Sequence, residues 1–532
     1  MLIWVLSAVA GATMPLLCGT SQHASEFLSH RPRSPSPPVP VPTLFDHESH
    51  GEIPNVLYSE QFALKWGPDH TMSDEHASAI LTHFEDIHTA EVDDWSMASP
   101  IDGVRYFNVY VGDTGGVIPS AGGMAGYYTT DSDHKPMIVL GLDTVADLTY
   151  ARSVIAHEYF HAVQWASESF WTWETGSWFW EATATWAAGE VVPDQDSYWN
   201  FLPFYALKPQ VGLYHDTMDA FGGAPPDLHQ YGAFIFARYI SEVLDRPETI
   251  LSAWRDGGTD EDPVAWLRIH MTDEVFGDAL VGHAARNLTW EYADGERWSD
   301  WVDEVASWHP EQDDRIAPLI AHSDEGWYTV SSEDTPAAGG YNLAPIPLDV
   351  VDGEELIVAV RADVEEGLAS ASKFRARVVS ILDGEPTTHI VDPAAPHTVI
   401  TVDPAAELWL VVAKIALIAD FPMNYKVAFF PQPDFPEEDE PVEDTGVPPI
   451  DDTGEAPEDT GEAAPEDPED PPPSADSDDA DTTTELDPPP AYDDNPSETE
   501  SKSGCSYIDN RQYIPTWLLF LVPALLVRRR NR

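Results

Sequence analysis

An apolar stretch between Val154 and Ala166 carries three residues that are costly to bury in any fold. Its composition predicts a buried helix. His157 and His161 are four residues apart, so both project from one face of that helix, with Glu158 beside them. Two imidazoles and a carboxylate inside a protein are expensive unless a metal ion or polar partners compensate them. The fold must therefore provide that compensation around this helix.

A third candidate ligand lies on the next predicted helix. The segment Trp178–Trp186 is rich in Ala and aromatic residues and predicts a helix. Thr175 or Ser177 is expected to cap its start, and Gly189 to end it. Glu181 falls in the first turn, 24 residues after the first histidine, where a connecting loop can bring its carboxylate to both imidazoles. Two His and one Glu with a fourth position open for water form a catalytic type of zinc site.

The pattern as a whole resembles the gluzincin metallopeptidases, over about residues 50–290. The resemblance rests on four residues and their spacing: His157, Glu158, His161 and Glu181. It implies that the two histidines and Glu181 bind Zn²⁺. It also implies that Glu158 acts as the general base toward the activated water, in the hydrolysis of peptide bonds.

Two departures from family patterns limit which zinc peptidases the chain resembles. The metzincin pattern is excluded, because Gln164 and Ser167 stand where it requires Gly and His. Thermolysin-like enzymes have Asn just before the third ligand and Asp four residues after it, and here those places hold Trp180 and Thr185. The usual carboxylate partner of a histidine ligand is therefore missing from this segment.

Residues 51–320 are expected to form an α+β, zincin-like metallopeptidase domain: a twisted sheet with the active-site helix, then a helical subdomain. Strands are expected at 56–66, 103–112, 122–130 and 136–143, and a helix capped by Ser73 at 73–94. In the family an edge strand pairs with an extended peptide, and the resemblance gives that role to 122–130. An ordinary surface hairpin fits this segment equally well.

The second half of this domain is expected to be helical, at 228–244, 247–255, 262–271 and 274–290. In gluzincins a Tyr or His from this wall often donates a hydrogen bond to the developing oxyanion. Tyr231 is the first candidate and His229 the second, and packing is the alternative role for the tyrosine. Seven tryptophans between positions 165 and 199 are expected chiefly to pack the two metal-bearing helices together.

Residues 325–431 change to a hydrophobic period of two, with turn signals at Asp352-Gly353 and Asp383-Gly384. Six or seven short strands of this kind predict an antiparallel β-sandwich as an accessory domain. No catalytic constellation is visible within it.

Residues 432–503 are expected to form a disordered acidic stalk. Between 434 and 500 there are 27 Asp or Glu, 14 Pro and no Lys or Arg. Asp-Thr-Gly occurs at 444–446, 452–454 and 459–461, but the apolar strands that flank this triplet in aspartic proteases are absent. The net charge of −67, about −40 without those 27 acids, argues against a nucleic-acid partner.

Both ends of the chain indicate export. Residues 1–22 are expected to be a signal segment, although no Lys or Arg precedes Arg31, and residues 23–50 are Ser/Pro-rich and expected to be flexible. The cysteines are Cys18 and Cys505, both in these terminal signals, so no disulfide is expected in the mature fold.

The tail, residues 504–532, contains Gly504-Cys505-Ser506, an apolar run at 514–527 and four terminal arginines. It resembles the myxobacterial-type, Cys-containing C-terminal sorting tail. The resemblance implies processing near Cys505 by sorting machinery, lipid attachment at that cysteine and display on the outer cell surface. A plain C-terminal membrane anchor is the alternative, although the apolar run is short for a transmembrane helix.

Two hypotheses of function follow. In the first, the chain is an exported cell-surface zinc peptidase that acts on peptides or proteins. In the second, it is a surface-displayed binding or adhesion protein whose zinc site is structural or degenerate. Glu158 favours the first, because a structural zinc site needs no base and closes its fourth position with a protein ligand.

Overall fold

The computed structural model describes residues 44–430 except 196, 215–227, 309, 325, 348–349, 352–353, 364–372, 393–394 and 416–423. The expected signal segment, the acidic stalk, the tail with Cys505 and the Asp352-Gly353 turn lie outside the described residues. No helix in the described part of the chain is long and apolar enough to cross a membrane.

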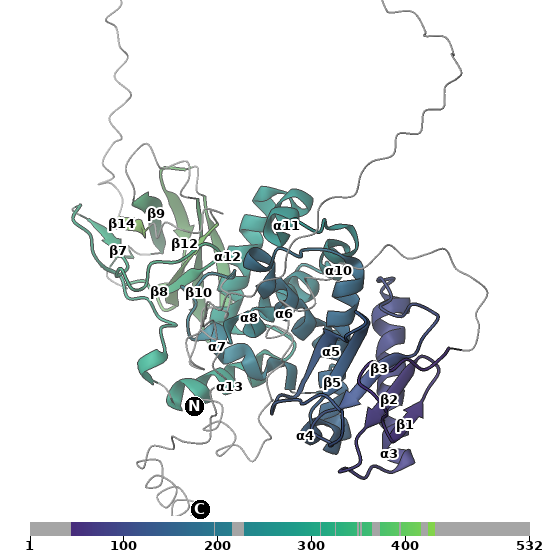
Figure 1. The fold of residues 1–532 in the computed structure, drawn as a ribbon. Helices are drawn as coiled ribbons and strands as arrows, with labels where there is room; N and C mark the ends of the chain where they lie inside the picture. The colour runs from purple at the N-terminus through teal and green to yellow at the C-terminus, as the bar shows by residue number, and fades with distance from the viewer. Residues whose placement is uncertain are drawn as a thin grey trace, which may run out of the picture. The chain divides into compact units, whose positions relative to one another are not determined.

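The amino-terminal part is built on a five-stranded sheet in the order β1-β2-β3-β5-β4 (Figure 1). The strands are β1 Asn55–Tyr58, β2 Phe62–Trp66, β3 Phe107–Val111, β4 Gly126–Thr130 and β5 Pro136–Leu140. β2, β3 and β5 run parallel, whereas β1 and β4 pair antiparallel at the two edges. The strand expected at 122–130 is therefore an edge strand. The single strand expected over 56–66 was wrong, because Ser59 bonds back to Phe62 and turns the chain into a hairpin.

Helices cover one face of this sheet. α3 Asp74–His88 begins at Ser73, whose hydroxyl accepts a hydrogen bond from the backbone N–H of His76, as expected. It continues as a π-helical turn, η1 Thr89–Asp94, which carries the buried Glu91. The short α4 Leu142–Ala146 leads into α5 Leu148–Ser167, the helix that contains both histidines.

The helix that carries Glu181 is longer than expected. α6 spans Trp173–Val191 with Thr172 at its N-cap, so Thr175 and Ser177 lie inside it rather than capping it. Gly189 does not end the helix. A Cβ at that position would lie 2.7 Å from a ring carbon of Tyr198, so glycine permits close packing there.

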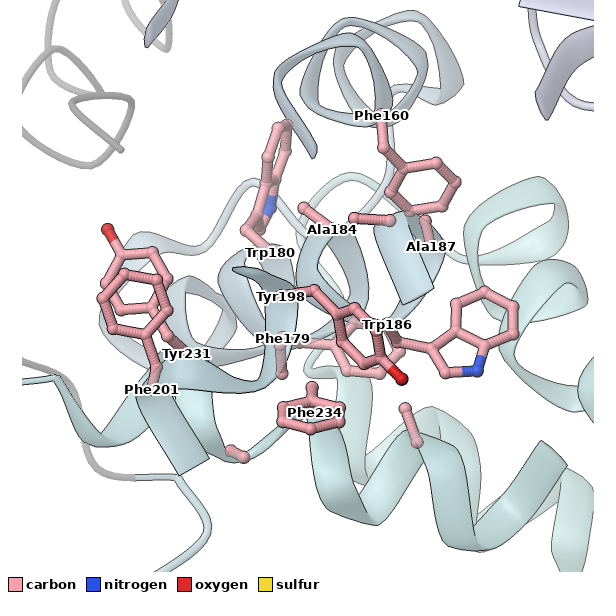
Figure 2. Packing of buried hydrophobic residues seen from close by; sticks show 14 of the residues in the cluster. Phe160, Phe179, Trp180, Ala184, Trp186, Ala187, Tyr198, Phe201, Tyr231 and Phe234 are labelled. Carbon is pink, nitrogen blue, oxygen red and sulfur yellow. The ribbon is translucent and has the colours of Figure 1, made fainter. Parts of the chain in front are cut away.

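The helical half follows the expected order. It comprises η2 Ser197–Phe201, α7 Leu202–Ala206, α8 His229–Gly232, α9 Phe234–Arg238, η4 Tyr239–Val243, α10 Pro247–Asp256, α11 Pro263–Met271, α12 Asp273–Thr289 and α13 Gly295–Trp308. The helix expected at 228–244 is broken at Ala233, and α13 was not expected. Large aromatic side chains pack between α6 and these helices, among them Trp180, Trp186 and Phe234 (Figure 2). The tryptophans are thus mainly core residues.

The carboxyl-terminal part is an antiparallel sandwich, as expected. One sheet has the order β11-β10-β13-β8 and the other β12-β9-β14-β7-β6, and their inner faces share an apolar core. The strands are β6 Ile320–Ala321, β7 Trp327–Thr329, β8 Tyr341–Pro345, β9 Glu355–Asp363, β10 Phe374–Leu382, β11 Glu385–Val391, β12 Thr398–Thr401, β13 Glu407–Lys414 and β14 Asn424–Phe430. Asp383 and Gly384 both have positive φ, the geometry of a tight type I′ hairpin.

Contacts cross both expected domain boundaries. α12 packs against β8, β10 and β13, and the apolar core continues across them. Residues 45–48, expected to belong to the flexible segment, contact the sheet. Phe45 pairs with Arg105, and the buried amine of Lys65 binds the segment through Asp46 and Glu48.

Candidate metal centre

Three side chains from two neighbouring helices converge on one point. Nε2 of His157 and Nε2 of His161, one turn apart on α5, are 3.2 Å from each other. Oε2 of Glu181, on α6, lies 3.3 Å from each of these nitrogens. The three residues form a group able to hold a metal ion, as their spacing in the sequence led us to expect.

The size of this triangle fits a small tetrahedral ion. An ion bound at about 2.0–2.1 Å by each of three ligands separates the ligand atoms by about 3.3–3.4 Å. The three edges of the triangle are 3.2, 3.3 and 3.3 Å. An ion at the centre of these ligands would retain an open fourth position.

Burial makes the group costly without a cation. His161 and Glu181 are fully buried, and neither oxygen of Glu181 receives a hydrogen bond from the described residues. Burial alone would raise the pKa of Glu181, but the positive charge of the neighbouring His161 lowers it. Burial likewise lowers the pKa of His161, but the Glu181 carboxylate outweighs it and raises that pKa. Each group stabilises the charged form of the other, as a bound cation would stabilise the carboxylate.

Each imidazole has a polar partner on its other nitrogen. Nδ1 of His161 lies 2.7 Å from Oε1 of Gln164, and Nδ1 of His157 lies 3.4 Å from Oγ1 of Thr185. The carboxylate expected to be missing does not appear in these contacts, and an amide and a hydroxyl take its place. Sequence reasoning noticed Gln164 and Thr185 only as departures from family patterns. Both residues lie on the helices that carry the candidate ligands, and this position was the signal that could have identified them.

A pocket opens beside the triangle and is lined by His157, Glu158 and Tyr231, among other residues. Glu158 is 1% exposed. Gly126 of the edge strand β4 approaches it so closely that a Cβ there would lie 3.2 Å from Cγ of Glu158. The carboxylate is thus held between α5 and β4, at the wall of a pocket that also reaches one of the candidate ligands.

The two residues considered for oxyanion binding lie in different places. Tyr231 lines the pocket, and its ring is stacked on that of His157 with 6.1 Å between the ring centroids. Its ring is tilted against that of Phe201, with the centroids 4.9 Å apart (Figure 2). His229 is fully buried against the ring of Tyr205, 4.7 Å away, and is not part of the pocket lining. Of the two, Tyr231 is the one that lines the pocket beside the candidate site.

Comparison with known proteins gives a family but no activity. No curated protein matches the chain. A family model matches residues 74–380, more than half of the chain, and this range contains α5, α6, the helical half and the first strands of the sandwich. The protein therefore belongs to DUF6055, a family of unknown function.

Proposed function

We propose that this protein is a zinc-dependent peptidase. The observation that carries the proposal is the triangle of His157, His161 and Glu181, whose edges fit tetrahedral zinc, with Glu158 on the adjoining pocket wall. Two imidazoles and one carboxylate are the donor set of catalytic zinc in peptidases. The same arrangement could not serve a closed structural site without a further ligand.

The zinc ion, when bound, would supply Lewis-acid activation of a water molecule and of the scissile carbonyl. Glu158 accepts a proton from the attacking water and passes it to the leaving amine. Its position between α5 and β4 excludes bulk water and limits its rotation. The hydroxyl of Tyr231, from the opposite wall, donates a hydrogen bond to the oxyanion.

A zincin-like arrangement is part of the proposal. Its support is a mixed sheet whose antiparallel edge strand β4 runs beside the helix that carries Glu158. An extended peptide added along β4 would bring its backbone past this carboxylate, because Gly126 already approaches Glu158. Export and display at the cell surface are likewise proposed, from the apolar start, the acidic segment and the tail around Cys505.

The test is a pair of substitutions assayed for metal content and for cleavage of a mixed peptide library. Glu158→Gln should retain zinc and lose about 10²–10⁴-fold in kcat, because the neutral amide cannot take the proton. His157→Ala should lose the metal itself. Glu274→Gln, an exposed change at the start of α12, is the matched control and should leave both measurements unchanged.

The two hypotheses separate in the same assay. If wild-type protein holds zinc but cleaves no peptide, and Glu158→Gln changes nothing, the peptidase proposal is wrong. The surface-displayed binding protein with a structural or degenerate site would then be favoured.

A further inference from the structure

We propose that Gln164 is a positioning residue that holds His161 in its metal-binding tautomer and locks the helix carrying Glu181 against α5. The inference rests on the proposed zinc site, but it concerns how this chain prepares the site rather than what the site cleaves. Gln164 is on α5, one turn after His161, and is fully buried.

The orientation of the Gln164 amide follows from its neighbours. Its Nε2 lies 2.9 Å from the backbone carbonyl of Trp180 and 2.9 Å from Oγ1 of Thr183. A carbonyl oxygen can only accept, so the amide atom facing Trp180 must be the nitrogen. The amide oxygen therefore faces Nδ1 of His161, at 2.7 Å, and a flipped amide would put two oxygens against each other.

This orientation determines the tautomer of His161. An amide oxygen accepts but does not donate, so Nδ1 of the imidazole must carry the hydrogen. In the neutral ring Nε2 then presents its lone pair, and this is the atom that lies 3.3 Å from Glu181 and 3.2 Å from His157. The residue thus aims an unprotonated nitrogen at the centre of the candidate site.

The same amide also fixes α6. Its two acceptors, Trp180 and Thr183, lie on either side of Glu181 in the sequence, so the glutamine bonds α6 on both sides of the third ligand. Oγ1 of Thr183 donates to the carbonyl of Phe179 and accepts from Nε1 of Trp254 on α10. Because Gln164 and Thr183 are fully buried, water has no access to replace a lost partner.

The other histidine is held more loosely. The contact between His157 and Thr185 is 3.4 Å long, and the side chain of His157 is 12% exposed at the pocket. We therefore expect His161 and Glu181 to form the preorganised half of the site and His157 to adjust when the metal enters.

The test is the zinc dissociation constant of the full chain, measured by competition with a chelating dye. Gln164→Met keeps the side-chain length but removes all three hydrogen bonds, and should weaken zinc binding by about 10–100-fold. Gln61→Met is the control, because that glutamine bonds Glu85 far from the candidate ligands, and it should leave zinc affinity unchanged. Thr185→Val should have a smaller effect than Gln164→Met.

A folded Gln164→Met protein that binds zinc as tightly as wild type would overturn the inference. If that variant does not fold, nitrogen NMR of the wild-type protein without zinc carries the test, at a pH where the ring of His161 is neutral. A hydrogen on Nδ1 of His161 supports the inference, and a hydrogen on Nε2 contradicts it. Peptide cleavage plays no part in these measurements, so a failed peptidase proposal would show up separately, as zinc binding without cleavage.

Discussion

The two faces of the amino-terminal sheet bury charge in different ways. On the face away from α3 and α5, the amine of Lys65 contacts Asp46 at 2.8 Å and Glu48 at 3.0 Å, and it donates to the carbonyl of His47 at 2.7 Å. On the helical face, Glu181 has two imidazoles beside it and no hydrogen bond from the described residues. In the first cluster a lysine compensates the carboxylates, whereas in the second two imidazoles do so, at a point where we propose that a metal ion binds.

The carboxyl group of Glu91 is a third buried acid, and its surroundings differ from those of both clusters. Glu91, in the π-helical turn η1, is fully buried, and its carboxylate makes no hydrogen bond with the described residues. Burial raises its pKa well above the ordinary 4.5. The three carboxyl groups therefore differ in their surroundings: Glu48 contacts a lysine, Glu181 lies beside two imidazoles, and burial alone raises the pKa of Glu91.

The largest effect on stability is expected from Lys65→Met. Removing the amine breaks its contacts with Glu48, 18% exposed, and Asp46, 40% exposed, and its hydrogen bond to the carbonyl of His47. After allowing for solvent at the carboxylates, this should cost about 3 kcal/mol of unfolding free energy. Urea denaturation at pH 7 measures this change. A loss below about 1 kcal/mol would mean that the partly exposed carboxylates are solvated without Lys65.

The same variant makes a prediction about pH. Burial raises the pKa of Glu48, but hydrogen bonds from His50 and Lys65 lower it from 4.5 to about 2. A depressed folded-state pKa gives stability that is present above pH 4.5 and lost as the pH falls toward 2. In wild type, unfolding free energy should fall across that window, and Lys65→Met should flatten the fall.

Removal of zinc should have the next largest effect. At a free zinc concentration 100 times the dissociation constant, binding to the native state adds about 2.7 kcal/mol, and a chelator removes that gain. His161→Ala should unfold at the same urea concentration with and without the chelator. If wild type is equally stable with and without the chelator, the native state does not bind the metal. The two faces of the sheet would then not differ in the way described.

Zinc affinity should also depend on pH. Burial lowers the pKa of His161, but the Glu181 carboxylate raises it by more. Protons therefore compete for the ligand nitrogen at a higher pH than in an isolated histidine. The zinc dissociation constant should therefore rise as the pH falls through the region of this pKa. An affinity that does not change between pH 5 and pH 8 would argue against imidazole ligation.

The smallest effect is expected at Glu91. Its raised pKa means that the folded state binds a proton more tightly than the unfolded chain. The stability that this provides is present below pH 4.5 and is lost as the pH rises toward the folded-state pKa. Glu91→Gln should remove this decline and stabilise the protein at pH 8 by on the order of 1 kcal/mol. The unfolding midpoints of wild type and Glu91→Gln at pH 5 and pH 8 measure this effect. If the difference between the two pH values is the same in both proteins, Glu91 does not titrate in this range.

Much of the architecture could be predicted because it depends on local patterns. Ser73 caps its helix as its sequence context indicates, and the Asp383-Gly384 hairpin follows from a dipeptide that accepts positive φ. Gly189 misled the prediction because a glycine can end a helix or admit a neighbouring ring, and only Tyr198, nine positions away, decides between them. The packing of α12 on β8, β10 and β13 was not predicted for a similar reason, since it joins segments far apart in the sequence.

Sequence alone determined that His157 and His161 share one face, because four-residue spacing on a helix is local geometry. Glu181 was expected in the first turn of its helix, but α6 already begins at Trp173, and the packing of α6 on α5 brings its carboxylate to both imidazoles. Tertiary structure alone decided what holds them. Trp254 reaches Thr183 across 71 positions, and Lys65 meets Glu48 from a neighbouring strand of the fold. Hydrogen bonds and ion pairs of this kind form only when the two atoms lie within a few tenths of an ångström of the right separation. Tertiary packing sets that separation, and the local order of residues does not encode it.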